Sequence, residues 1–160
     1  MAPSILLSLL RLAPLIGTTA ALWFSIDIQL FLRTFEELSD RQAANAVVPA
    51  YFKASFHKGA VVGRPLYLAI LVTGLANVFV QPTDAWVWYA AGAAAGFVPF
   101  AFANRLLASI KRIEDGEGKG NSVGDLDVML RVHAIRTALG NLPMWACMLI
   151  ATLKATTVVG

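Results

Sequence analysis

The sequence contains little cysteine and little charge. Of its 160 residues, one is a cysteine, Cys147, and 14% are Asp, Glu, Lys or Arg. A single cysteine excludes a disulfide framework, a CxxC pair and a cysteine-based zinc site within one chain. In contrast, 58% of the residues are hydrophobic and the mean hydropathy is +0.65, well above the usual balance of a soluble domain. The composition therefore predicts an integral membrane protein.

The basic charge balance does not indicate a nucleic-acid-binding protein. The formal net charge is +3 and the pI is near 9.3, but the basic residues lie in short segments between apolar stretches rather than on one continuous polar face. We therefore expect no nucleic-acid partner. We expect the lipid bilayer as a partner and leave a homo-oligomer open.

Four apolar stretches have the length of membrane spans. A span needs about 20 mostly apolar residues to cross about 30 Å of hydrocarbon, and the stretches that meet or nearly meet this are residues 12–32, 61–80, 85–103 and 133–153. The sequence predicts an all-α fold, an integral membrane four-helix bundle, in a single transmembrane domain of residues 1–160. Arg11 interrupts the first apolar run and no basic n-region precedes it, so we expect an uncleaved first span.

The segments between the spans predict their orientation. Basic residues concentrate in connections 33–60 and 104–132, namely Arg33, Arg41, Lys53, Lys58, Arg105, Lys111, Arg112, Lys119 and Arg131. The opposite side has Arg11, Lys154 and the short turn at 81–84. The positive-inside rule places both connections in the cytosol and both termini outside or in a lumen. We expect connection 33–60 to lie along the cytosolic surface and the glycine-rich segment 114–125 to be a flexible turn.

The third stretch contains a small-residue motif, GAAAG, from Gly92 to Gly96. Small residues four positions apart let two helices approach closely in a bilayer. This pattern predicts a packing seam in the third span.

Polar residues gather at the predicted cytosolic ends of all four spans: Asp27, Gln29, Arg64, Asn104, His133 and Arg136. Ionisable groups at membrane depth cost roughly 2.5 to 3.5 kcal/mol each on insertion scales, so they tend to face the interior of a bundle and to find partners there. Their convergence at one end predicts a polar pocket.

Helical geometry indicates which of these groups share a face. At 100° per residue, Arg136 lies about 60° from His133, Thr137 about 40° on the other side, and Gly140 nearly in line, while Arg131 points about 160° away. We expect Gly140 to leave space in the pocket and Arg131 to be an interfacial anchor. Asp27 and Gln29 are about 200° apart, so at most one of them faces the same pocket.

A purely structural interpretation stays open. Arginines at the ends of spans can extend to the headgroups, a buried histidine or asparagine can simply bond a neighbouring helix, and Asp27 can pair with Arg33 or Arg64. The chain would then be a non-catalytic membrane protein, either a transport component or a scaffold with a structural polar cluster.

Three segments resemble a known family: HAIRTALGN in the fourth span, VPFAFANRLL at the end of the third, and HKGAVVGRPLYL at the start of the second. They are similar to the anthrone oxygenase family (DUF1772) of small four-span membrane proteins, over most of the chain. The most specific element is the H-x-x-R pair of His133 and Arg136, together with Asn104. An aromatic residue shortly before the histidine is common in that family, and here Met129 and Leu130 occupy those positions.

The resemblance implies an oxidoreductase of aromatic polyketide biosynthesis in secondary metabolism. Such a monooxygenase converts an anthrone to an anthraquinone with O2 and without flavin, in the endoplasmic reticulum. The anthrone methylene is acidic because its carbanion is an aromatic phenolate, which reacts with O2. The protein then needs only to bind, deprotonate and shield a small aromatic polyketide substrate.

We expect four catalytic residues and six substrate-binding residues. His133 is the candidate base, kept neutral by Arg136 and Arg64; the two arginines would stabilise the enolate and the peroxide anion, and Asn104 would orient the substrate oxygen. Asp27 or Gln29 would fix the histidine tautomer. Substrate contacts are expected from Asp27, Gln29, Phe97, Phe100, Thr137 and Trp145, the three aromatic residues as a flat wall.

No metal or haem is predicted, with O2 as the co-substrate. His133, His57 and Asp27 are possible ligands, but no two candidate ligands have chelating spacing on one helix face. A metal or haem stays an open alternative. We expect His57, beside Lys58, to be solvated.

Overall fold

The computed structural model describes residues 5–80, 84–116 and 120–157. In chain order the elements are α1 (Ile5–Glu37), α2 (Arg41–Val80), α3 (Ala85–Ala95), α4 (Val98–Ala101), α5 (Ala103–Asp115), α6 (Ser122–Arg136), a π-helical turn η1 (Thr137–Asn141) and α7 (Leu142–Thr157). No strand occurs in the described ranges. The all-α prediction is confirmed.

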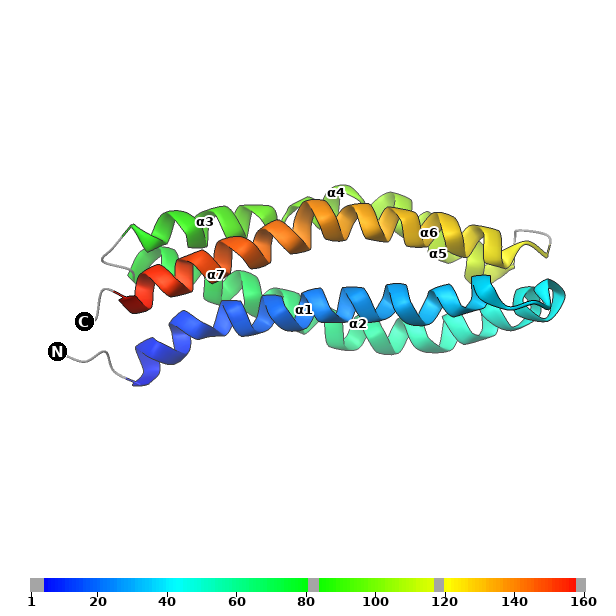
Figure 1. The fold of residues 1–160 in the computed structure, drawn as a ribbon, viewed down its shortest axis with the longest axis horizontal. Helices are drawn as coiled ribbons and strands as arrows, with labels where there is room; N and C mark the ends of the chain where they lie inside the picture. The colour runs from blue at the N-terminus through cyan, green and yellow to red at the C-terminus, as the bar shows by residue number, and fades with distance from the viewer. Residues whose placement is uncertain (1–4, 81–83, 117–119, 158–160) are drawn as a thin grey trace.

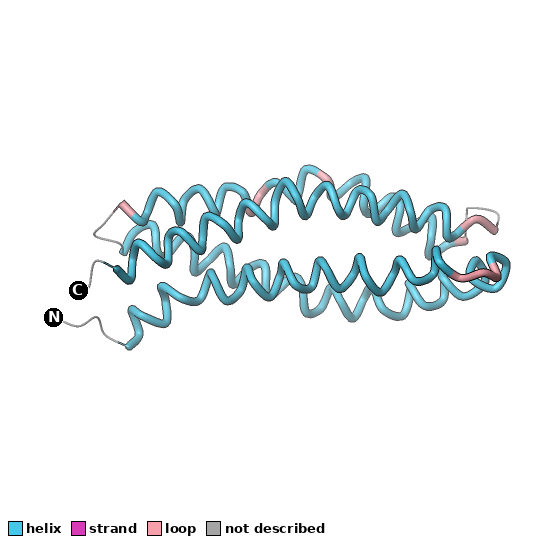
Figure 2. Tube along the Cα trace, in the orientation of Figure 1, coloured by secondary structure: helices cyan, strands magenta, loops and turns pink. Residues whose placement is uncertain are grey.

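The helices run side by side along one elongated molecule (Figure 1). Helix α1 packs along α2, α3 along α7 and α5 along α6, while α1 also contacts α6 and α7. Figure 2 shows that the loops are short and lie at the two ends of the molecule, apart from brief breaks between α3, α4 and α5. The beginning of α1 and the end of α7 lie at the same end of the molecule.

Three helical segments are long and apolar enough to cross a membrane: Ile5–Glu37, Arg41–Val80 and Ser122–Thr157. Ala85–Ala101 and Ala103–Asp115 meet at an angle of 43° and give a fourth candidate if the bent pair forms one span. Within the described residues, the chain thus has three such helices, or four with the bent pair.

The helices extend well beyond the predicted spans. Predicted span 61–80 is only the second half of α2, and most of connection 33–60 belongs to α1 and α2. The largest apolar cluster also lies in these extensions and in connection 104–132, with the buried members Leu32, Ala44, Val48, Phe52, Ile110, Ile113, Val123, Leu126, Met129 and Leu130. Segment 33–60 is therefore mostly helix continuous with the predicted spans, and its apolar side chains pack against α5 and α6.

The glycines of the GAAAG motif allow a close helix contact, as the motif predicts. A Cβ on Gly92 would lie 2.8 Å from the Met148 methyl carbon, and one on Gly96 would lie 2.9 Å from Leu71 Cδ2. Gly96 also ends α3, and Pro99 lies in the short α4 that follows. The seam is present, but the third predicted span is broken within its length.

Prolines explain two irregularities of the helices: a carbonyl in α1 that lacks its backbone donor, and the π-turn before α7. Pro14 in α1 has no N–H for the Leu10 carbonyl, and Asn77 of α2 donates its side-chain amide to that oxygen at 2.7 Å. Pro143, near the start of α7, follows the π-turn η1 directly. Because a proline ring clashes with the carbonyl four residues earlier, a widened turn at this point relieves the clash.

The glycine-rich segment 114–125 is only partly described. Helix α5 ends at Gly116, whose φ of 64° is the left-handed conformation favoured by glycine at helix ends. Gly120, with φ of 87°, lies just before α6. Lys119, and residues 81–83 of the predicted 81–84 turn, lie outside the described residues.

Candidate functional site

His133 is the centre of a buried polar cluster. It lies near the end of α6 with 3% of its surface exposed. Its Nδ1 is 3.2 Å from Nε2 of Gln29 on α1, and its Nε2 is 3.0 Å from Nη2 of Arg136, one turn further along. The same Gln29 nitrogen donates to the Leu130 carbonyl at 2.8 Å. The predicted meeting of His133, Arg136 and Gln29 is therefore seen in the structure.

A second set of polar contacts begins at the π-turn. Asn141 is fully buried and donates from Nδ2 to the Ser25 hydroxyl at 2.7 Å, while the Tyr67 hydroxyl donates to Asn141 Oδ1. Ser25 in turn donates to the Ala21 carbonyl at 2.9 Å. Sequence reasoning missed these residues, although an asparagine and a proline inside an apolar span were a signal.

The π-turn brings Asn141 onto the face of His133. Each residue of a π-helix turns by less than 100°, because its hydrogen bonds close i→i+5 rings. Asn141 is eight residues after His133, and the wider turn rotates it back toward α1. Ser25 and Gln29, one turn apart on α1, therefore bond Asn141 and His133 respectively.

An apolar groove lies beside this cluster, between α1 and the α6–η1–α7 rod. It is an open groove of about 380 Å³, lined by Leu22, Ser25, Ile26, Gln29, Leu30, Ala134, Thr137, Ala138 and Leu142. The volume is within the range of small-molecule sites. Gln29 belongs to both the groove and the cluster, and His133 lies behind it.

Two buried polar atoms near the groove have no hydrogen-bond partner among the described residues. They are Nε of Arg136 and Oγ1 of Thr137. Buried donors without partners are costly, commonly by about 1–3 kcal/mol, and are uncommon in native proteins. Both groups are able to bind an oxygen atom of a ligand.

Three curated proteins that are similar to this chain are all named epoxidases. Probable epoxidase scpX of Mollisia scopiformis is 32% identical over 155 residues, which cover 94% of this chain and 98% of that protein. The chain belongs to the family of this epoxidase. Epoxidase pydX of an Acremonium species is 31% identical over 154 residues (93% of this chain, 95% of the relative), and epoxidase gkaX of Penicillium citrinum is 28% identical over 154 residues (93% and 96%).

The epoxidase relatives support an oxygenase-type role and an oxidative enzyme. No protein-family model matches the chain, so membership of the anthrone oxygenase family is not shown. No solved structure matches either.

Two predicted catalytic residues of this epoxidase-family chain lie away from the cluster. Arg64 and Asn104 are both exposed. Their positions at the ends of predicted spans suggested convergence, but Arg64 lies within the continuous helix α2 and Asn104 near the start of α5, and both point outward. The structure does not bring them to His133.

The predicted aromatic wall does not form at the groove. Phe97 and Phe100 are 56% and 60% exposed, and their ring centroids are 6.1 Å apart. Trp145 is partly buried and donates to the Thr19 hydroxyl at 3.0 Å. Among the groove-lining residues none is aromatic, so its walls are aliphatic.

The structure also shows the surroundings of three other residues considered in the sequence: Asp27, Gly140 and His57. The side chain of Asp27 is partly buried and forms no hydrogen bond or ion pair within the described ranges, so Gln29 is the residue that meets the histidine. Gly140 does not open space, because a Cβ there would lie 2.8 Å from Cδ of Pro99. His57 has a 72% exposed side chain, 3.9 Å from Glu114, as expected for a solvated residue.

A second buried polar group lies toward the other end of the molecule. Arg11 is 7% exposed and donates from Nη1 to the Ala155 carbonyl at 3.2 Å, while Tyr89 donates to the Arg11 carbonyl at 2.9 Å. The sequence suggested that buried polar groups gather at one end of the molecule, but the structure has them toward both ends. Position along the chain alone does not distinguish a reactive cluster from a structural one.

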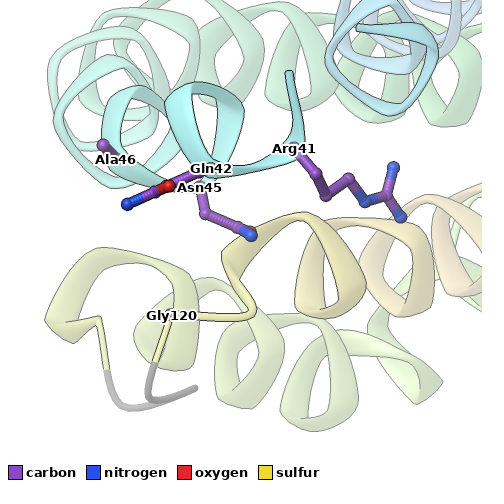
Figure 3. A pocket seen from close by; sticks show the side chains of 5 residues that line it. All are labelled: Arg41, Gln42, Asn45, Ala46 and Gly120. Carbon is purple, nitrogen blue, oxygen red and sulfur yellow. The ribbon is translucent and has the colours of Figure 1, made fainter. Parts of the chain in front are cut away.

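An open hollow occurs at the loop end, lined by Arg41, Gln42, Asn45, Ala46 and Gly120 (Figure 3). Asn45 points toward the start of α6, where its Oδ1 accepts the Val123 N–H at 2.9 Å. This contact satisfies an N-terminal donor of α6, so Asn45 has a structural role here.

The described part of the chain contains no group of three or more His, Cys, Asp or Glu side chains arranged for a metal ion.

Proposed function

We propose that this protein is a membrane-embedded oxidative enzyme that uses O2 to oxidise an apolar substrate bound in the α1–α6 groove. The observation that carries the proposal is that Gln29 joins this aliphatic groove to His133 and Arg136. Full-length similarity to named epoxidases supports the reaction class.

The surface of the helices supports the membrane environment. In the most apolar windows of α1, α2 and α6–α7, only 28%, 11% and 28% of the residues are buried within the molecule. Exposed apolar side chains such as Leu68, Val72 and Phe79 are suited to lipid. We extend the proposal to four spans with both termini lumenal and the long connections cytosolic, in the endoplasmic reticulum.

The reaction begins with removal of a proton from an acidic C–H group of the substrate. His133 accepts the proton, and the electron pair stays in the substrate as an enolate or phenolate-type carbanion. Arg136 stabilises that negative charge from a partly buried position. The carbanion itself reduces O2 and combines with it to give a substrate peroxide, so this step requires no flavin or metal.

Two products follow from such a peroxide. Transfer of its distal oxygen to a neighbouring C=C bond breaks the O–O bond and gives an epoxide and a hydroxyl group, with both oxygen atoms retained. Loss of water instead gives a ketone, as in conversion of an anthrone to an anthraquinone. The names of the relatives favour the epoxide, and the motif resemblance favours the anthrone oxidation as a second candidate.

The rival interpretation is a non-catalytic membrane protein in which the same cluster only joins helices. To test it, the gene is deleted in the source organism, and the compound that accumulates is incubated with yeast membranes that contain the protein, under 18O2. An epoxide product that gains 36 mass units, the mass of two 18O atoms, supports the first route, and an anthrone that yields singly labelled quinone supports the second. Equal conversion by wild-type, His133→Ala and empty membranes contradicts an enzymatic role.

A further inference from the structure

The His133 ring is approached by a nitrogen donor on each side. Nδ1 lies 3.2 Å from Gln29 Nε2, and Nε2 lies 3.0 Å from Arg136 Nη2. A guanidinium group only donates, and a neutral imidazole has one lone pair and one N–H. His133 can therefore accept a hydrogen bond from one of these neighbours, but not from both.

The Leu130 carbonyl fixes the orientation of the Gln29 amide. It is an acceptor and lies 2.8 Å from Gln29 Nε2, so the amide must present its nitrogen there, because a flipped amide would place two oxygens in contact. That NH2 group has two hydrogens: one goes to Leu130 and the other points at Nδ1. The Gln29 nitrogen is held against Nδ1 by its second hydrogen bond, whereas Nη2 of Arg136 has no other hydrogen bond among the described residues that holds it against Nε2. The lone pair therefore falls on Nδ1, and the proton on Nε2.

This assignment releases Arg136. Its contact with His133 Nε2 then joins two donors and is no hydrogen bond, and its Nε also has no partner among the described residues. Arg136 is therefore available to an anionic oxygen. Gln29, in contrast, lines the groove and covers the lone pair of Nδ1.

We propose that Gln29 is a positioning residue that holds His133 with its lone pair on Nδ1, on the groove side, and that Nδ1 accepts the proton of the substrate. The inference rests on the proposed function. The substrate C–H bond breaks, the N–H bond forms at Nδ1 as the Gln29 amide turns aside, and the electron pair remains in the substrate anion next to Arg136.

The first test reads the tautomer directly and needs no substrate. The sequence has two histidines, so His57→Gln, at an exposed position, leaves a single imidazole for 15N NMR in detergent. We expect the Nε2–H tautomer in this background. In Gln29→Met, which keeps the side-chain length, Arg136 donates to Nε2 and the proton moves to Nδ1. An Nδ1–H tautomer before the Gln29 change overturns the assignment.

The second test measures turnover. Gln29→Met is expected to lower kcat by about tenfold or more while KM changes by less than about twofold, because substrate binding persists and proton transfer does not. Unchanged kcat overturns the positioning role. If no variant or wild type oxidises any substrate but the tautomer shifts as expected, the proposed function fails and the assignment of Nδ1 remains.

Discussion

The amide nitrogen of Gln29 lies 3.2 Å from Nδ1 of His133, across 104 positions of sequence. This contact joins α1 to α6 at the edge of the aliphatic groove. It couples a residue that a ligand can touch to a buried imidazole, and the predictions below depend on this arrangement or on the packing that maintains it.

Replacement of the two central residues should separate chemistry from folding. His133→Gln removes the proton acceptor and should lower turnover by about 100-fold or more. Arg136→Lys keeps a charge but loses the planar guanidinium, and we expect a loss of at least about tenfold. Turnover by membranes with matched protein levels measures both effects, and Arg131→Lys, on the exposed outer face, is the control.

The groove should be sensitive to volume at Ala138. Ala138→Phe places a ring between α1 and η1, so KM for an apolar substrate should rise by about tenfold or more. Leu139→Phe is the matched control, since Leu139 is 56% exposed and does not line the groove. Equal KM values for the two variants would place the substrate elsewhere.

The Asn141 contacts should stabilise the fold. Asn141→Leu leaves the partly buried Tyr67 and the buried Ser25 with fewer hydrogen-bond partners, at a cost of about 1–3 kcal/mol, measured as a lower thermal unfolding midpoint in detergent. A double-mutant cycle of Asn141→Leu with Tyr67→Phe should show non-additive coupling of about 0.5–3 kcal/mol. Additive effects would show that the two side chains do not interact.

The glycine seam should not tolerate a larger side chain. Gly96→Val brings Cβ to 2.9 Å from Leu71 Cδ2 and 3.1 Å from the Met144 sulfur, so these two side chains must shift, at a cost of about 1–3 kcal/mol. Gly63→Val is the comparison, because a Cβ there meets only Phe24 at 3.9 Å. Similar unfolding midpoints for the two variants would contradict a close seam.

Local signals in the sequence were sufficient for several parts of this protein. Apolar runs predict the helices, because hydrophobic content and periodicity are properties of each segment alone. The GAAAG motif predicts the seam, and the three-residue spacing of His133 and Arg136 predicts that they meet, because both lie on one turn of one helix.

Tertiary structure decided the rest. Arg64 and Asn104 are at the ends of predicted spans but point outward, whereas Tyr67 and Asn141 point inward, and no local pattern fixes the rotation of one helix against another. The π-turn before Pro143 shifts the register of α7, which brings Asn141 to Ser25. The sequence by itself determined which segments are helical and apolar; packing between distant helices determined which polar groups meet, because those contacts depend on rotations and registers that only the assembled fold sets.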